Sequence, residues 1–197
     1  MKGSDGLRAF CEDLASPEPA PGGGTASAAA GAMAASLLSM VCGITLKSKR
    51  HEANWPALGV LKNRADELGS LLLKHADLDA MTYLEVVQRA RAKREAPGDE
   101  KAAAAYEEAV HKAMDVPAST AEACVRVLSL AREVAAVGTK SASSDIEVAR
   151  LLAAAGADGA VANVMINLPY CADASFAARA RGRAEALARE KSGLLAR

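Results

Sequence analysis

Aromatic residues are scarce in this chain of 197 residues, where Phe, Trp and Tyr together make up 3%. Residues that favour β-strands are correspondingly few, whereas alanine, which has the highest helix propensity, is abundant. We therefore expect an all-α fold whose core consists of Leu, Val, Met and Ala side chains. The length suits one domain, so we predict that residues 1–197 form a single bundle of long antiparallel helices.

The chain also lacks an excess of charge of either sign, because 24 Lys and Arg residues balance 24 Asp and Glu residues. Binding to nucleic acid or to an anionic membrane surface requires a basic patch, so we expect neither partner. The segment 22–46 contains no charged residue. Its many Ala, Gly, Ser and Thr residues nevertheless favour a buried helix of a soluble bundle over a membrane-spanning helix.

Cysteine pairs and histidine pairs with metal-binding spacing are absent from the sequence. The four cysteines are far apart and form no CxxC motif, which is typical of reduced thiols in a cytoplasmic protein. His51, His75 and His111 lack the i,i+4 spacing of a helical zinc site. We therefore expect a cytoplasmic location and no metal site.

Apolar residues recur at helical spacing through most of the chain, and proline and glycine mark the breaks. The expected helices cover residues 5–15, 24–46, 57–94, 99–137, 144–168 and 171–195. Pro117 falls inside the fourth helix and predicts a kink there. Gly138 is expected to cap this helix at its C-terminus, and Ser144 begins a Ser-Asp-Ile-Glu sequence that matches a capping box.

An acidic residue interrupts an apolar seam in the third expected helix. The seam runs from Leu58 to Leu72 in steps of three and four residues, and the same count continues to His75 and Asp79. A buried carboxylate is costly unless it is satisfied, and burial raises its pKa towards neutrality. Asp79 is thus a candidate acid–base group; the alternative is a structural pair with a lysine or a cap on a local kink. We interpret His75 as a packing residue.

Two amides stand in an apolar stretch of the fifth expected helix. Asn163 and Asn167 lie four residues apart, so both face the same side. A bound heterocycle or an inter-helix hydrogen bond would satisfy them. Asp145 precedes Asn163 by roughly 27 Å at 1.5 Å per residue. These two residues can share a site only across a dimer interface; otherwise Asp145 stabilises the first turn of its helix.

A Pro-Gly-rich segment precedes the second expected helix. Residues 19–25 read Pro-Ala-Pro-Gly-Gly-Gly-Thr, which lacks the pattern of a phosphate-binding P-loop. Free N–H groups and the positive end of the helix dipole would nonetheless suit an anionic or oxyanion-like group.

Together these segments resemble the cyclodeaminase/cyclohydrolase family of folate enzymes, which includes the C-terminal domain of formiminotransferase-cyclodeaminase and stand-alone methenyltetrahydrofolate cyclohydrolases. The matching segments keep their order along nearly the whole chain; they are 16–25, 28–46, Asp79-Ala80, Val116-Pro117, Ser144-Asp145 and 163–168. The chain differs at 138–141, where relatives commonly carry asparagines, and at 95–98, where Glu-Ala-Pro-Gly replaces a Leu-Pro-Lys element.

The resemblance implies a homodimer that acts on a tetrahydrofolate derivative at a site near the subunit interface. The expected catalytic residues are Asp79, which transfers the proton, and Asp145. The asparagines would orient the pterin, the glycines would hold negative charge, and the lysines would attract the glutamate tail. The expected substrate-binding residues are Pro21, Gly22, Gly23, Gly24, Thr25, Lys47, Lys49, Asn163 and Asn167.

The family's reactions act on the one-carbon unit between N5 and N10 of folate, and they need an acid and a base but no metal or redox cofactor. We expect hydrolysis of 5,10-methenyltetrahydrofolate to 10-formyltetrahydrofolate, with no cofactor. One alternative is formiminotetrahydrofolate cyclodeaminase activity, which releases ammonia; it ranks second because no formiminotransferase domain accompanies this sequence. The other alternative is a non-catalytic folate-binding or scaffolding bundle, which the residues at 138–141 favour.

Overall fold

The computed structural model describes residues 4–196, and within that range every regular element is a helix, which confirms the all-α prediction. Three short 3-10 segments, η1 (Lys49–Asn54), η2 (Lys140–Ala142) and η3 (Leu168–Tyr170), join the longer helices. The α-helices are α1 (Ser4–Ala15), α2 (Gly23–Leu46), α3 (Trp55–Glu95), α4 (Glu100–Val137), α5 (Ser143–Asn167) and α6 (Ala174–Leu195).

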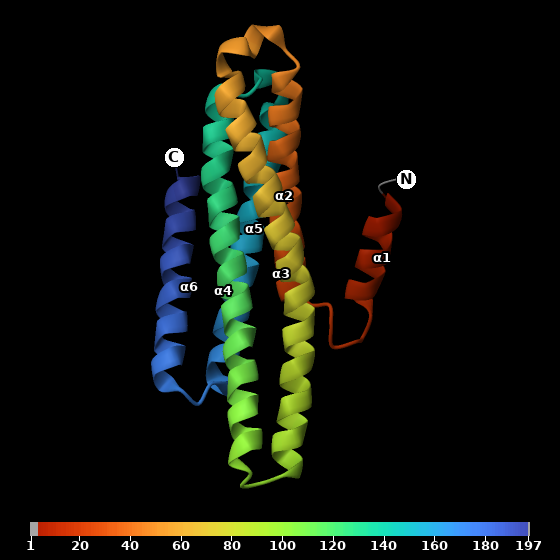
Figure 1. The fold of residues 1–197 in the computed structure, drawn as a ribbon, viewed down its shortest axis with the longest axis vertical. Coiled ribbons are helices and arrows are strands. Elements are labelled where there is room, and N and C mark those ends of the chain that lie inside the picture. Colours follow the sequence, from red (N-terminus) through yellow and green to blue (C-terminus); the bar gives the residue numbers. More distant parts are fainter. Residues whose placement is uncertain (1–3, 197) are drawn as a thin grey trace.

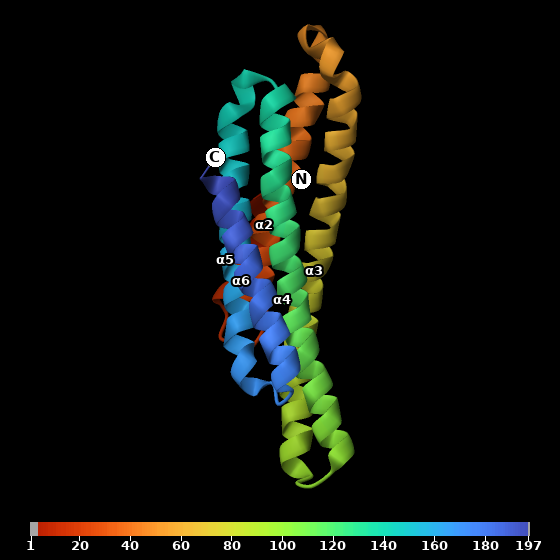
Figure 2. The ribbon, with the colours of Figure 1, turned by 90° about the vertical axis from the view of Figure 1, so that its left-hand side faces the viewer.

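The five long helices, α2 to α6, run alternately up and down in one bundle (Figure 1). Helix α2 contacts α3, α4 and α5, and α6 packs against α4 and α5. The hairpin of α3 and α4 extends beyond the ends of the other helices (Figure 2). Helix α1 stands beside the bundle at an angle and has no buried residue (Figure 1).

Small residues let the central helices approach one another closely. Ala28, Ala35 and Leu38 of α2 are fully buried. A methyl group on Gly31 would lie 2.6 Å from Cys124 Sγ, and one on Gly156 would lie 2.7 Å from the backbone oxygen of Ser27. Because interiors are close-packed, these two glycines set how near α4 and α5 come to α2.

Two segments, Gly23–Leu46 and Lys140–Tyr170, are long and apolar enough to cross a membrane by length and composition alone. The core helix of a soluble bundle passes the same test. Helices α2 and α5 contact each other, and both contribute fully buried residues to the main core, for example Val41 and Ala149. We therefore interpret both segments as core helices.

Three details of the helix ends and of α4 differ from, or refine, the sequence expectation. Helix α5 begins at Ser143 and no side chain caps it, so the predicted capping box is wrong. Gly138 is the C-cap residue of α4, but its φ of −74° is open to any residue. Glycine is favoured there because a methyl group would lie 2.8 Å from the Val134 carbonyl oxygen. Helix α4 runs without a break across the buried Pro117.

Candidate active site

The carboxylate of Asp79 on α3 lies against the first turn of α2. Thr25 Oγ1 donates a hydrogen bond of 2.9 Å to Asp79 Oδ2. A methyl group on the buried Gly24 would come within 2.6 Å of Asp79 Cγ and 2.7 Å of Oδ2. A side chain at position 24 would therefore displace the Asp79 carboxylate, and Gly24 itself has no positive φ.

This first turn of α2 is a suitable place for an anion. Gly22 is the extended N-cap residue. Because glycine has no side chain, it cannot cap the N–H groups of this first turn. The N-terminus of a helix carries a partial positive charge that stabilises a nearby carboxylate. The glycines at 22–24 were expected to hold negative charge of a ligand; in the structure, a carboxylate of the protein itself lies at this helix end.

Burial and hydrogen bonding act in opposite directions on Asp79. Burial raises the pKa of its carboxyl group above the usual value, and the Thr25 side chain and backbone partly offset the rise because they bond to the ionised form. The net direction is upward. A carboxyl group whose pKa moves towards neutrality is suited to act as a general acid or base near physiological pH.

Asn163 of α5 lies beside the same turn of α2. Its Nδ2 atom would be 3.6 Å from a methyl group on Gly23, and it donates a hydrogen bond of 2.8 Å to the Gly159 carbonyl oxygen. Helix α5 comes this close because Gly159 has no side chain; a methyl group there would overlap the Ser27 hydroxyl. The structure thus brings Asp79 and Asn163 to the two sides of one helix start.

Asn167 has structural partners. Its Nδ2 atom donates to the carbonyl oxygens of Ala113 on α4 and Asn163, each at 2.9 Å. The inter-helix hydrogen bond, which the sequence left open as the alternative to ligand binding, is therefore present at this position. Asn167 also borders a groove of about 420 Å³, so it both fixes α5 against α4 and faces a hollow.

This groove, called the tyrosine groove below, lies between α3, α4 and η3. It contains all three tyrosines of a chain that is poor in aromatic residues. Tyr83 follows Asp79 by one helical turn, so the groove continues along α3 from the carboxylate. This groove was not predicted from the sequence, although Asp79, Tyr83 and Val86 share one face of a helix. The lining residues are Tyr83, Val86, Val87, Ala90, Arg91, Arg94, Tyr106, Val110, Asn167 and Tyr170.

The remaining candidate residues lie at the other end of the bundle. Gly24 is separated from Lys47, the C-cap residue of α2, by roughly 35 Å at 1.5 Å per residue. Helix α5 begins at that far end, with Asp145 in its first turn (Figure 1). Within one chain the structure therefore brings Pro21–Thr25, Asp79, Asn163 and Asn167 to one region. It does not bring Lys47, Lys49 or Asp145 there.

His75 is a packing residue, as expected from the sequence. Its side chain is buried, and its Nδ1 atom lies 3.3 Å from Thr120 Oγ1. Burial lowers the pKa of its ring, so the neutral form is favoured.

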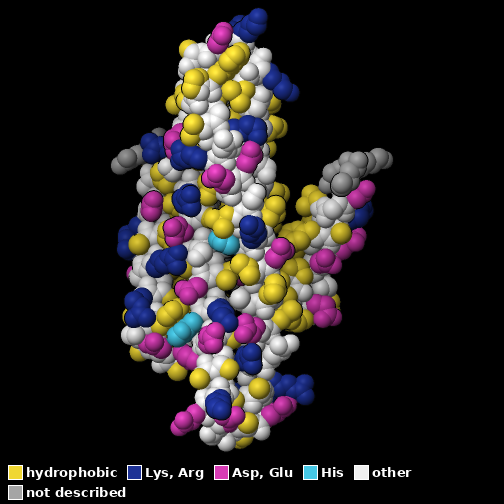
Figure 3. Space-filling model, viewed as in Figure 1, with side chains coloured by type: hydrophobic (Ala, Val, Ile, Leu, Met, Phe, Trp, Pro, Cys, Tyr) yellow, Lys and Arg dark blue, Asp and Glu magenta, His cyan; other side chains and the backbone are white. Residues whose placement is uncertain are grey.

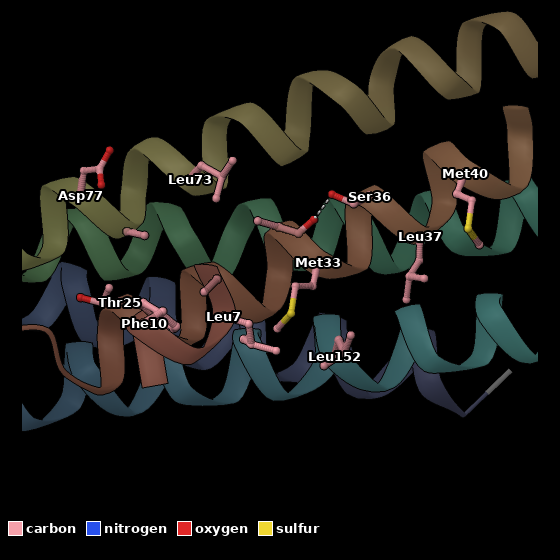
Figure 4. Close-up of a pocket in the computed structure, with 13 residues that line it drawn as sticks. Leu7, Phe10, Thr25, Met33, Ser36, Leu37, Met40, Leu73, Asp77 and Leu152 are labelled. Carbon is pink, nitrogen blue, oxygen red and sulfur yellow. Dashed lines mark hydrogen bonds between the residues drawn. The ribbon is translucent and has the colours of Figure 1, made fainter. Parts of the chain in front are cut away.

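A second hollow, called the apolar groove below, has a volume of about 840 Å³ and lies where α1 leaves the bundle. Figure 3 shows hydrophobic side chains gathered in this angle, and Figure 4 shows Leu7 of α1 beside Met33 of α2 and Phe10 beside Thr25. Leu73 in its wall is 59% exposed. An exposed apolar surface of this kind commonly marks a protein interface. The larger side chains of its lining are Leu7, Phe10, Met33, Leu37, Met40, Leu73 and Leu152.

The fold and the candidate site together define an all-helical protein in which a half-buried carboxylate with a raised pKa is held against a glycine-rich helix start. The sequence model of the formiminotransferase-cyclodeaminase family matches residues 6–186. Because this match covers most of the chain, the protein belongs to that family, as the resemblance indicated.

Known relatives include enzymes of two activities. The chain is 35% identical over 198 residues to the methenyltetrahydrofolate cyclohydrolase of Methylorubrum extorquens, which covers 100% of this chain and 91% of that protein. It is 31% identical over 185 residues to the formimidoyltransferase-cyclodeaminase of Sus scrofa, covering 93% of this chain but only 34% of that longer protein. The solved structure of a formiminotetrahydrofolate cyclodeaminase from Thermotoga maritima matches with a TM-score of 0.85 and 26% identity, over 95% of this chain and 90% of that one.

Proposed function

We propose that this protein hydrolyses 5,10-methenyltetrahydrofolate to 10-formyltetrahydrofolate. The observation that carries the proposal is Asp79, a half-buried carboxylate with a raised pKa, held by Thr25 and by the space at Gly24. The similarity to a cyclohydrolase over the full chain, at 35% identity, supports this reaction.

The proposed mechanism needs one group that accepts a proton and later returns it. The Asp79 carboxylate removes a proton from a water molecule as its oxygen attacks the methenyl carbon between N5 and N10. The bond from that carbon to N5 then breaks, N5 takes the proton from Asp79, and the hydroxyl group of the adduct loses its proton to solvent as the formyl group forms. The net reaction consumes one water molecule and releases one proton, so proton transfer is the only chemistry required.

The tyrosine groove offers a place for the remainder of the substrate. Aromatic side chains such as Tyr83 and Tyr106 suit a benzoyl ring, since aromatic pairs stack or meet edge to face. Arg91 and Arg94 lie further along α3 and present guanidinium groups that match carboxylates. We propose that the p-aminobenzoyl group occupies the groove, with the glutamate carboxylates at the two arginines and the pterin towards Asn163.

We further propose that the protein is a homodimer whose subunits meet at the apolar groove. Three residues of the groove, Met33, Leu37 and Met40, lie around the middle of α2. A twofold axis through the groove would therefore cross α2 near its centre. Such an axis places the α2 helices antiparallel. The C-terminal end of the partner's α2 would then lie beside the first turn of α2 with Thr25 and Asp79. This arrangement would bring Lys47, Lys49 and Asp145 of the partner subunit towards the folate site.

No metal or redox cofactor is required by the proposed chemistry, because Asp79 and water supply what the reaction needs. We also propose a cytoplasmic location. The four cysteines are free, two of them buried, and such thiols persist in a reducing compartment.

The reaction is tested by following the loss of methenyltetrahydrofolate absorbance with wild-type protein, with Asp79→Asn and with Asp115→Asn as the matched control. Asp115 is an exposed aspartate of α4. We expect faster loss with wild type and Asp115→Asn than in buffer, and a return to nearly the buffer rate with Asp79→Asn. Wild-type protein that is no faster than buffer rules the proposal out.

The dimer with a shared site is tested by mixing two inactive variants. Asp79→Asn and Asp145→Asn chains are denatured together and refolded, so that mixed dimers form. Random pairing makes half of the dimers mixed. If each site takes Asp79 from one subunit and Asp145 from the other, a mixed dimer has one intact site of its two. About a quarter of the wild-type activity should then return. No recovery in a mixture that is dimeric by light scattering argues against a site shared in this way.

A second candidate function is formiminotetrahydrofolate cyclodeaminase activity, favoured by the structural match to the Thermotoga maritima enzyme. In that reaction N10 attacks a formimino carbon and ammonia leaves, so the demands on Asp79 are nearly the same. Release of ammonia from 5-formiminotetrahydrofolate by wild-type protein would support it. Folate binding without turnover of either compound would instead support the non-catalytic bundle.

A further inference from the structure

Three potential metal ligands of different kinds meet at the start of α6, on elements that the folate proposal does not use for chemistry. Glu107 and His111 are one turn apart on α4, and Cys171 lies in the segment between η3 and α6. One ligand atom from each lies within 4.8 Å of the other two. The set combines a carboxylate oxygen, an imidazole nitrogen and a thiol sulfur, which are the three donor types that zinc accepts in proteins.

The distances within this cluster are close to those of a tetrahedral zinc site. With ligand bonds of about 2.0–2.3 Å, the edges between neighbouring ligand atoms are roughly 3.3–3.6 Å long. Glu107 Oε1 lies 3.2 Å from Cys171 Sγ and 3.3 Å from His111 Nε2. The distance from Cys171 Sγ to His111 Nε2 is at most 4.8 Å.

Hydrogen bonds explain the positions of Glu107 and Cys171 but not that of His111. The Cys171 thiol donates a hydrogen bond of 3.2 Å to Glu107 Oε1. Glu107 Oε1 accepts hydrogen bonds from the backbone N–H groups of Ala172 and Asp173, at 2.8 and 2.9 Å, and so holds the segment before α6. His111 Nε2 has no such role, because among the described residues it is buried without a hydrogen-bond partner. It lies near Glu107, but in a direction that makes no hydrogen bond. A buried, unpartnered nitrogen beside a thiol and a carboxylate has the surroundings of a metal ligand.

The ring of His111 is also held in place before any metal binds. It stacks on Phe176 of α6, with ring centroids 3.8 Å apart and an angle of 10° between the planes. This contact keeps Nε2 directed at the cluster, which reduces the ordering cost of binding. Cys171 also lines a hollow of about 510 Å³, which provides an entry path for an ion.

We propose that Glu107, His111 and Cys171 form a zinc-binding site that ties α4 to the start of α6. On binding, the Cys171 thiol gives its proton to water and coordinates as the thiolate. His111 coordinates through Nε2 as the neutral ring, Glu107 contributes a carboxylate oxygen, and a water molecule completes the tetrahedron. The site is structural, and the metal is not a participant in the proposed folate reaction.

The test uses the full chain, freed of metal with a chelator and then titrated with Co²⁺ and with Zn²⁺. For wild type we expect one ion per chain, a near-ultraviolet thiolate-to-cobalt absorbance band, and a melting temperature that rises with zinc. Cys171→Ser should lose the cobalt band. His111→Phe keeps a ring to stack on Phe176 but has no ligand nitrogen, and it should bind zinc more than about tenfold more weakly.

Cys11→Ser is the matched control, because Cys11 is an exposed cysteine of α1 outside the cluster. It should retain the cobalt band and the wild-type zinc affinity. The proposal is overturned if wild type gives no cobalt band, or if Cys171→Ser and His111→Phe bind zinc as tightly as wild type does. It is also overturned if Cys11→Ser abolishes the band, because the thiolate would then come from another part of the chain. None of these results depends on folate turnover, so failure here leaves the hydrolase proposal standing.

Discussion

A single methyl group at position 24 is expected to lower activity strongly while leaving the fold intact. In the structure the Asp79 carboxylate occupies the space that the side chain of Gly24→Ala would need. The added carbon would lie 2.6 Å from Asp79 Cγ, whereas ordinary contacts of this kind are 3.4–4 Å long. The carboxylate, or the stretch of α3 that carries it, must therefore move by roughly 1 Å, and the hydrogen bond from Thr25 is stretched or broken.

The consequences for stability and for activity differ in size. Overpacking costs about 1–3 kcal/mol, and the better helix propensity of alanine offsets up to about 1 kcal/mol of this. Catalysis is more sensitive, because misplacing a reacting group by about 1 Å can lower the rate about 100-fold. We therefore expect kcat/KM for methenyltetrahydrofolate hydrolysis to fall by about 100-fold or more, with a loss of no more than about 2 kcal/mol in the free energy of unfolding.

The matched control is Gly43→Ala on the same helix. A methyl group there would meet only Lys62 Cε at 3.8 Å, an ordinary contact. This variant should be as stable as wild type or up to about 1 kcal/mol more stable, and it should keep wild-type kcat/KM. Urea denaturation gives the stabilities, and initial rates of absorbance loss give kcat/KM. If Gly24→Ala hydrolyses the substrate as fast as Gly43→Ala, the position of Asp79 does not control the reaction and our reasoning is wrong.

Four further predictions concern the same site and the core. Thr25→Val removes a hydrogen bond to the ionised form of Asp79, so the pKa of Asp79 should rise further. The acidic limb of the kcat/KM–pH profile should then move to higher pH. An unmoved limb would exclude Asp79 as the titrating group. Because burial raises the folded-state pKa of Asp79 above its unfolded value, its contribution to stability is present below the unfolded pKa and is lost as the pH rises through the folded pKa. Asp79→Asn should therefore be more stable than wild type at neutral pH in urea titrations, and this advantage should disappear in acid. Asn167→Ala breaks the hydrogen bond to Ala113 on α4 and should cost about 1–3 kcal/mol by the same measurement. Leu38→Ala leaves a cavity at a fully buried position and should cost about 2–5 kcal/mol; a loss below 1 kcal/mol would mean that the core closes over the gap.

Local sequence patterns were sufficient to predict the helices. Helix propensity and apolar periodicity act over a few residues, so each α-helix was located to within a few positions of its observed ends. The predicted helix caps that were wrong or incomplete depend on more than the local pattern. Ser144 is preceded by a 3-10 turn that carries the chain into α5 one residue early, and Gly138 is favoured by the close approach of Val41 and Val134 rather than by its own turn geometry.

The residues of the candidate site were only partly predictable. A carboxylate on an apolar seam identified Asp79 because burying a charge is costly wherever it occurs in a sequence. The same type of argument selected Asn167, but in the structure its amide bonds to the Ala113 carbonyl oxygen on α4. The sequence could not predict this partner, because it depends on how α4 and α5 cross. Glu107 and His111 have i,i+4 spacing, but the third member of that cluster, Cys171, is far along the chain, so the sequence did not predict the cluster.

The sequence by itself determined that this protein is helical, that α2 is buried, and that Asp79 is an unusual carboxylate, because composition, periodicity and the cost of burying charge can be evaluated without knowing which helices touch. Only the tertiary structure decided that Asp79 meets the first turn of α2, that the three tyrosines share one groove, and that Lys47 and Asp145 lie at the opposite end of the chain's own bundle. These outcomes depend on how closely pairs of helices pack. That closeness is set by glycines such as Gly24 and Gly159, whose missing side chains matter only once a particular neighbour is in place.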